Sequence, residues 1–166
     1  MLINQLFLLQ QGMPMQNNNP IEPTSEQSKM IEEAVALHQS GQLDLAETQY
    51  KKLLNDLPDN TTLLTNLGTI ALQRGRLEDA VRIIGKSLNI DPNQPNALNI
   101  SGVALRDLKR LDEALASFDR AIALNPDYAD AYSNRGVTLQ DLKRLDEALA
   151  SFERAIALNP DYADAY

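Results

Sequence analysis

The sequence predicts an all-α fold, a right-handed superhelix of stacked helical hairpins, from a long internal repeat and from the small residues and prolines that recur in phase with it. Residues 107–132 recur as residues 141–166 with one change, Asp119 against Glu153. The offset, 141 minus 107, is 34 residues. Stepping this offset back through the chain aligns four prolines and four alanines: Pro58, Pro92, Pro126 and Pro160, and Ala46, Ala80, Ala114 and Ala148. A fixed period of this kind is typical of solenoids, in which each unit packs on its neighbours.

The period divides the chain into a leader and an array. We expect repeats at residues 27–60, 61–94, 95–128 and 129–162, with residues 163–166 opening a fifth. Residues 1–26 are expected to be disordered or weakly ordered. Their apolar opening is interrupted by Asn4 and Gln5 and follows no Lys or Arg, so it reads as neither a signal peptide nor a membrane span. We therefore expect a cytoplasmic protein.

Each repeat is expected to contain two amphipathic helices. The third repeat shows one apolar stripe in its first half and one in its second, formed by Leu98, Gly102 and Leu105 and by Leu115, Phe118 and Ile122. Asp112 and Glu113 follow the break between the stripes and are expected to cap the second helix. Each second helix is expected to end before its proline, which lacks the N–H that a helix interior needs.

Small residues predict close approach of the two helices in each hairpin. Glycines on the first helices are expected to face alanines on the second: Gly68, Gly102 and Gly136 against Ala80, Ala114 and Ala148. In the second repeat Gly85 lies inside the second helix, where glycine costs about 1 kcal/mol relative to alanine. That helix is predicted to be a weak point.

These features resemble the tetratricopeptide repeat family over about residues 27–166. The matching positions are Leu98, Gly102, Ala114, Phe118, Ala121 and Pro126 in repeat three, and Tyr132, Gly136, Ala148, Phe152, Ala155 and Pro160 in repeat four. The array is similar to the N-terminal repeats of bacterial O-linked N-acetylglucosamine transferase-like proteins. Repeat one departs from the pattern at Glu33 and Ala34, as a solvated terminal repeat should.

Composition argues against several classes of function. The net charge is −8 and the sequence pI is about 4.6, which disfavours nucleic acid as a partner. The chain has no cysteine and one histidine, and it carries no phosphate-binding loop or nucleophile motif. We expect no enzyme activity, no cofactor and no metal. His38 is interpreted as a solvated helix residue without a role.

The resemblance implies that the first helices line a concave groove that binds an extended peptide. The expected groove residues are Asn66, Thr69, Gln73, Asn99, Val103, Arg106, Asn134, Val137 and Gln140. Asn66 and Asn134 match the asparagine ladder of the transferase-like proteins, and Ile100 interrupts it. An amide both donates and accepts hydrogen bonds, as a peptide main chain requires. Peptide contact and simple solvation both stay open for these asparagines.

The function expected is a protein–protein interaction scaffold with a protein or peptide client and no membrane association. The alternative is the substrate-recruiting arm of a larger bacterial glycosyltransferase or sulfotransferase, with the catalytic domain beyond residue 166. We also expect Leu149, Phe152 and Ile156 to be partly uncovered, which favours self-association through the last repeat. A lysine–asparagine clamp for a C-terminal carboxylate is not expected, because Ile31 and Val35 occupy its places.

Overall fold

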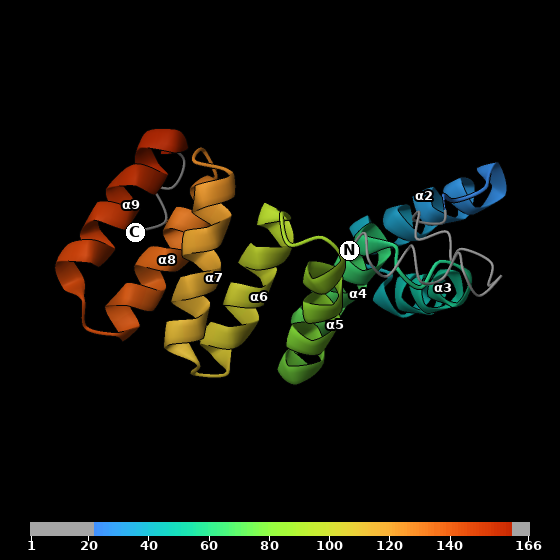
Figure 1. The fold of residues 1–166 in the computed structure, drawn as a ribbon, viewed down its shortest axis with the longest axis horizontal. Coiled ribbons are helices and arrows are strands. Elements are labelled where there is room, and N and C mark those ends of the chain that lie inside the picture. The colour runs from blue at the N-terminus through green and yellow to red at the C-terminus, as the bar shows by residue number, and fades with distance from the viewer. Residues whose placement is uncertain (1–21, 161–166) are drawn as a thin grey trace, which may run out of the picture.

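The computed structural model describes residues 22–160, which form eight α-helices paired into four hairpins (Figure 1). The helices are α2 (Ser25–Gln39), α3 (Leu43–Asp56), α4 (Thr61–Gln73), α5 (Leu77–Ile90), α6 (Pro95–Asp107), α7 (Leu111–Leu124), α8 (Ala129–Asp141) and α9 (Leu145–Leu158). The second helices of the hairpins begin one repeat length apart, at Leu43, Leu77, Leu111 and Leu145. The expectations for the leader before residue 22 and for a fifth repeat at 163–166 lie outside the described residues.

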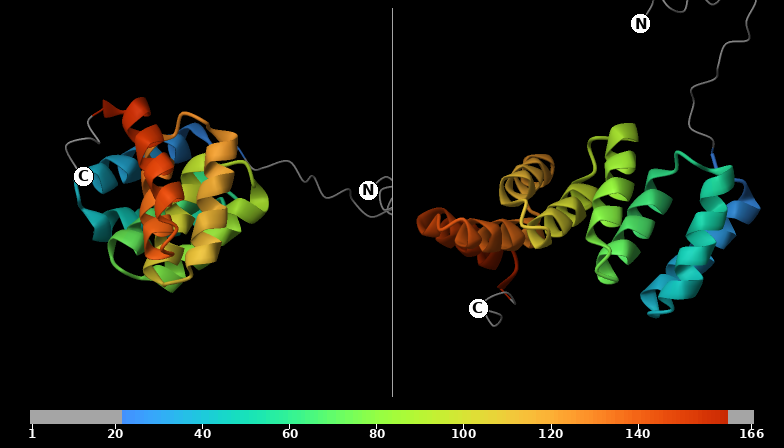
Figure 2. Two further views of the ribbon diagram at one scale, coloured as in Figure 1. Left: turned by 90° about the vertical axis from the view of Figure 1, so that its left-hand side faces the viewer. Right: turned by 90° about the horizontal axis from the view of Figure 1, so that it is seen from below.

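The hairpins stack in chain order into a helical superhelix, as expected. Each helix packs against the next one along the chain, and α4 and α8 also contact α6. In Figure 2 the hairpins follow one another in a row, and their direction changes gradually from α2–α3 to α8–α9. The first helices α4, α6 and α8 therefore share one side of the stack, which we call the inner surface.

The turn within each hairpin has the same geometry in all four repeats. After α6, the Lys109 N–H donates to the carbonyl of Arg106 at 2.8 Å and the Arg110 N–H donates to that of Leu105 at 2.9 Å. This pair of bonds is the Schellman motif, which needs a left-handed residue after the helix. Repeats one and two use Gly41 (φ 76°) and Gly75 (φ 68°), whereas repeats three and four use lysines, Lys109 (φ 62°) and Lys143 (φ 63°).

The second helices end where the sequence predicts, but the prediction of the residues that cap their starts is wrong. Each second helix ends before its proline, as α7 does at Leu124. Its start is different: Arg110 is the N-cap residue of α7, and no side chain caps the helix. Glu113 instead accepts two hydrogen bonds from the Arg110 guanidinium, at 2.7 and 2.6 Å, and these bonds lower the pKa of the carboxyl. Asp112 contributes only its charge to the first turn.

The close approach within each hairpin involves a different pair from the one expected. A Cβ added at Gly102 would lie 2.5 Å from Cε1 of Phe118, and one at Gly136 would lie 2.5 Å from Cε1 of Phe152. At Gly68 the neighbour is Ile84. Each glycine therefore makes room for the large side chain four residues after the repeat alanine, because that side chain points back onto the first helix.

The core is a series of clusters at the successive junctions. Phe118 is fully buried with Ala114 and Leu105, and Leu115 is buried with Leu139 of the next repeat. The equivalent residue on α9, Leu149, is 59% exposed. Phe152 and Ile156 are half-buried, so the expectation of a partly uncovered face is confirmed for α9.

Candidate peptide-binding surface

The inner surface carries a chain of hydrogen-bonded amides that links α6 to α8. The Asn134 amide donates to Oδ1 of Asn99 at 3.1 Å, and the Asn99 amide donates to the Tyr128 hydroxyl at 3.3 Å. That hydroxyl in turn donates to Oδ1 of Asn96 at 3.3 Å. Burial raises the pKa of Tyr128, as does the nearby charge of Asp130, while the bond from Asn99 opposes the shift. The phenol stays protonated and holds the first turn of α6 against α8.

Arg106 brings the only expected groove cation to the same surface. Its guanidinium lies 3.5 Å from Oδ1 of Asn134 and pairs with the carboxylate of Asp107 at 3.1 Å. The repeat position equivalent to Asn66 and Asn134 is occupied in α6 by Ile100, which is buried, and the bond to Asn134 comes from Asn99, one residue earlier. An amide ladder is thus present between α6 and α8, but in a register that the family pattern did not indicate.

The other expected residues lie along the first helices with varied exposure. Thr69 is half-buried and donates to the carbonyl of Thr65 at 2.9 Å. Val103 packs beside the Phe118 cluster, Val137 is half-buried and Gln140 is exposed. The structure places all nine residues on α4, α6 and α8, and it joins only Asn99, Arg106 and Asn134 directly to one another.

His38 is more engaged than the sequence suggested. Its Nε2 lies 3.1 Å from Oε1 of Gln73, and its ring makes an edge-to-face contact with Tyr50 at 6.1 Å between centroids. The interpretation of His38 as a purely solvated residue is therefore wrong, because it bridges the ends of α2 and α4. Tyr50 is fully buried, which raises the pKa of its phenol, and the nearby Asn66 side chain opposes that shift without a well-formed hydrogen bond.

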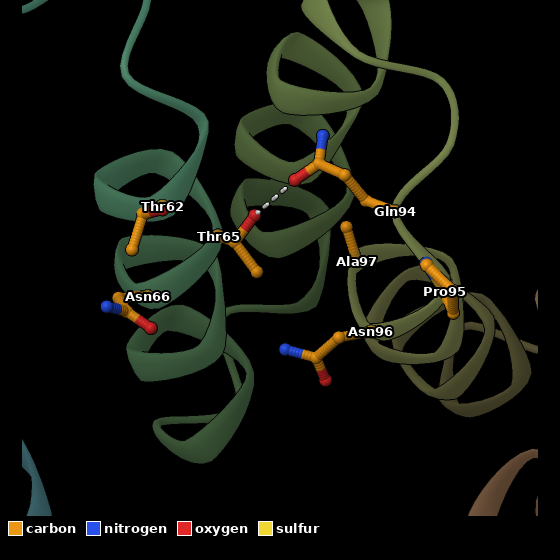
Figure 3. A pocket seen from close by; sticks show the side chains of 7 residues that line it. All are labelled: Thr62, Thr65, Asn66, Gln94, Pro95, Asn96 and Ala97. Carbon is orange, nitrogen blue, oxygen red and sulfur yellow. Dashed lines mark hydrogen bonds between the residues drawn. The ribbon is translucent and has the colours of Figure 1, made fainter. Parts of the chain in front are cut away.

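A pocket of about 240 Å³ opens between α4 and the start of α6 (Figure 3). One wall is Thr62, Thr65 and Asn66 of α4, and the other is Pro95, Asn96 and Ala97 of α6. Gln94 also lines the pocket, and its Oε1 accepts hydrogen bonds from the hydroxyls of Thr65 at 3.4 Å and Ser87 at 3.2 Å. Only Asn66 of these residues was expected from the sequence. A comparison of sequence positions one repeat apart could have revealed the pocket, since Gln94 occupies the position that Tyr128 occupies in the next repeat.

A cluster of charged side chains links the first two hairpins, between α3 and the turn that connects α4 to α5. Glu47 of α3 is 8% exposed, and it accepts two hydrogen bonds from Arg76 (3.1 and 2.7 Å) and pairs with Lys51 at 2.7 Å. Arg74 adds a contact at 3.4 Å. Burial disfavours the charged carboxylate, but the bonds from Lys51 and Arg76 outweigh this effect and lower the pKa of Glu47. Repeats two to four have aliphatic residues at this place, so the cluster is particular to the first junction.

Within residues 22–160, no group of three or more acidic, histidine or cysteine side chains is arranged to hold a metal ion. None of the helices in this part of the chain is both long and apolar enough to cross a membrane.

The fold and the amide-lined surface define a class of protein, a solenoid built from helical hairpins whose second helices begin one repeat length apart. Family models for the tetratricopeptide repeat match residues 37–101 and 129–162, and a TPR repeat model matches residues 102–143. The chain belongs to the tetratricopeptide repeat family.

Solved structures give the same result. The chain is 31% identical to a protein described as "Crystal structure of MamA", with a TM-score of 0.73 over 80% of this chain and 78% of that one. A second MamA structure has 29% identity, a TM-score of 0.74 and coverage of 84% and 76%. A structure titled "First TPR of Spaghetti (RPAP3) bound to HSP90 peptide SRMEEVD" has 30% identity and a TM-score of 0.59, with coverage of 60% and 79%. No curated protein sequence matched the chain.

Proposed function

We propose that this protein is an interaction scaffold that binds an extended segment of a partner protein along the inner surface of α4, α6 and α8. The observation that carries the proposal is the line of amide and hydroxyl groups that crosses from one first helix to the next, from the pocket at Asn66 to the Asn99–Asn134 pair. Asn99 is itself 8% exposed and already bonded to Asn134 and Tyr128. The half-buried amides of Asn66 and Asn134, however, can satisfy both the N–H and the C=O of an added main chain. The peptide-bound RPAP3 repeat shows that a related array accepts a short peptide.

The partner segment needs no strong charge of its own to bind this surface. Arg106 is already paired with Asp107, and the remaining expected contact residues are neutral. We therefore expect binding through main-chain hydrogen bonds and small apolar contacts at Val103 and Val137. Affinity should depend little on salt, in contrast to a surface that recruits clients by charge.

The test uses two matched double variants of the full chain. Gln73→Arg with Val137→Arg places two long cations on the inner surface, and Ala116→Arg with Ala150→Arg places two at exposed positions on α7 and α9. Both variants change the net charge equally. The probe is a set of peptides selected from a random linear library against the wild-type chain, with affinity measured by fluorescence polarisation.

We expect the inner-surface variant to weaken binding at least tenfold and the α7/α9 variant to leave it unchanged. Equal effects of the two variants, or failure to select any peptide, would contradict the proposal. Circular dichroism melts of both variants control for loss of structure.

The transferase-arm alternative is not favoured by the relatives found, and we do not adopt it. Cytoplasmic location and the absence of nucleic-acid and membrane partners stay predictions.

We propose a second interaction, in which the face of α9 that carries Leu145 and Leu149 packs on the same face of a second copy of the chain. Leu145 and Leu149 on this face are 60% and 59% exposed, while Leu115, the residue one repeat earlier, is 8% exposed beneath α8. Covering such residues removes apolar surface from water at about 25 cal/mol per Å². Sedimentation of the wild-type chain should show a dimer that Leu149→Glu dissociates, and a wild-type monomer at high concentration would refute the pairing.

A further inference from the structure

The pocket beside Gln94 exists because one repeat junction lacks a side chain that the next junction has. Between α6 and α8 the phenol of Tyr128 reaches across to Asn96 and Asn99. One repeat earlier, the equivalent places are Gln94, Thr62 and Thr65. Gln94 bonds to Thr65 and Ser87, and its amide nitrogen donates to the carbonyls of Ser87 and Asp91 at 3.1 and 2.7 Å. It turns toward α5 and stops short of Thr62.

The space left open is the space that a tyrosine fills in the following repeat. Its volume of about 240 Å³ is below the roughly 300–1,000 Å³ of pockets that hold a whole small molecule. It suits a single side chain. Pro95 is half-buried and offers apolar surface for a ring, and Figure 3 shows the side chains of Asn66 and Asn96 on opposite walls of the opening. Each amide can both donate and accept, so a phenol hydroxyl finds partners on either wall.

We propose that this pocket binds a tyrosine side chain of the partner segment, with its ring against Pro95 and its hydroxyl between the Asn66 and Asn96 amides. The inference rests on the proposed function, because it assigns one anchor of the segment on the inner surface. Aromatic side chains are common anchors in binding sites, since they bury a large area with few rotatable bonds. The ring from the partner fills the space that the Tyr128 ring fills one repeat later, but its hydroxyl bonds to Asn66 and Asn96 rather than to Thr62 and Thr65, the equivalents of the Tyr128 partners.

The experiment uses the full chain labelled with ¹⁵N and three small probes: N-acetyl-tyrosinamide, N-acetyl-phenylalaninamide and N-acetyl-leucinamide. We expect the tyrosine probe to give saturable chemical-shift changes at the side-chain amides of Asn66 and Asn96. The phenylalanine probe should bind several-fold more weakly because it lacks the hydroxyl, and the leucine probe should give no saturable change. No saturation with the tyrosine probe, or equal changes with all three, would overturn the proposal.

Two variants test whether the response comes from this pocket. Gln94→Tyr supplies the missing ring from the chain itself and should weaken probe binding at least tenfold, whereas Asn93→Tyr adds the same ring at an exposed neighbouring position and should not. Thr62→Phe narrows the opening from an exposed position without disturbing the Gln94 bonds, and it should also block the probe. Undiminished probe binding in both pocket variants would refute the assignment.

The selected peptides separate this inference from the scaffold proposal. Peptides that bind the inner surface but lack an enriched tyrosine, together with a negative probe titration, would leave the scaffold standing and remove the tyrosine pocket. A positive probe titration with no selected peptides would show that the pocket accepts a tyrosine side chain but would contradict the scaffold proposal, and with it the role of the pocket as an anchor for a partner segment.

Discussion

Replacing Gly102 by alanine tests the packing of the hairpins most directly. The new Cβ would lie 2.5, 2.6 and 2.9 Å from three ring atoms of Phe118. The optimum separation between carbon atoms is about 3.5–4.0 Å, so the ring would have to retreat by roughly 1 Å. Phe118 is fully buried and a ring cannot bend away, so the helices themselves must separate.

The expected cost follows from two opposing effects. Overpacking of this kind costs about 1–3 kcal/mol, and replacing a helical glycine by alanine gains roughly 0.5–1 kcal/mol. We expect Gly102→Ala to lower the free energy of unfolding by about 1–2 kcal/mol. Gly85→Ala is the matched control, because a Cβ there would meet no atom within 4 Å. That variant should be stabilised by the propensity gain alone.

Urea denaturation followed by helical circular dichroism measures both variants, with hydrogen exchange locating the loss in repeat three. Repeat arrays need not unfold in one step, so the midpoints are compared through a nearest-neighbour fit. Pairing Gly102→Ala with Phe118→Leu should recover part of the loss, since the smaller side chain leaves room. The reasoning is refuted if Gly102→Ala stabilises the chain as Gly85→Ala does, or if Phe118→Leu shows no coupling with it.

Three further predictions concern single residues. Lys109→Gly should raise the free energy of unfolding by about 0.5–1 kcal/mol, because it relieves a left-handed lysine at a turn where Gly75 serves in repeat two; a lower urea midpoint would contradict this. Glu47→Gln should cost roughly 1–2 kcal/mol at pH 7. Because folding lowers the pKa of Glu47, its contribution is present above the usual glutamate value of about 4.3 and is lost as the pH falls through the folded-state pKa, so urea midpoints of wild type and variant should converge in acid. Ser87→Ala should lower the free energy of unfolding by about 1 kcal/mol, because it removes a buried hydroxyl that bonds to Thr65 and to the Thr61 carbonyl. Ser117→Ala should be nearly neutral in the same urea titration, because the Ser117 hydroxyl bonds at an exposed position to the Glu113 carbonyl of its own helix.

Periodicity predicted the fold because it records which positions are buried at every junction. The proline in the loop after each second helix marked where that helix ends, and the shared glycines marked the close approach of the helices. The partners of those glycines could not be predicted, since Phe118 reaches Gly102 through the direction of its side chain rather than through sequence spacing. Arg110 likewise displaced Asp112 as the residue at the helix start, because a bidentate pair with Glu113 was available.

The inner surface was predictable as a set of helices and less so as a set of contacts. Asn99 and Asn134 were both expected there, but their mutual bond depends on a one-residue difference in register between α6 and α8. The pocket depends on Gln94, which looks like an ordinary loop residue until it is compared with Tyr128. Glu47 was missed for a similar reason, since its partners come from the next hairpin and no local pattern connects them.

The repeated turn geometry has a consequence for how the length of such an array can change. Residues 107–132 and 141–166 are nearly identical, and the Arg110–Glu113 and Arg144–Glu147 pairs have the same bond lengths, 2.7 and 2.6 Å. Excision of residues 107–140 would join Arg106 to Asp141, a copy of the Arg106–Asp107 pair that it replaces. Unequal recombination within the gene can therefore add or delete a whole hairpin here without creating an unfamiliar junction, and the array can lengthen or shorten in a single genetic step.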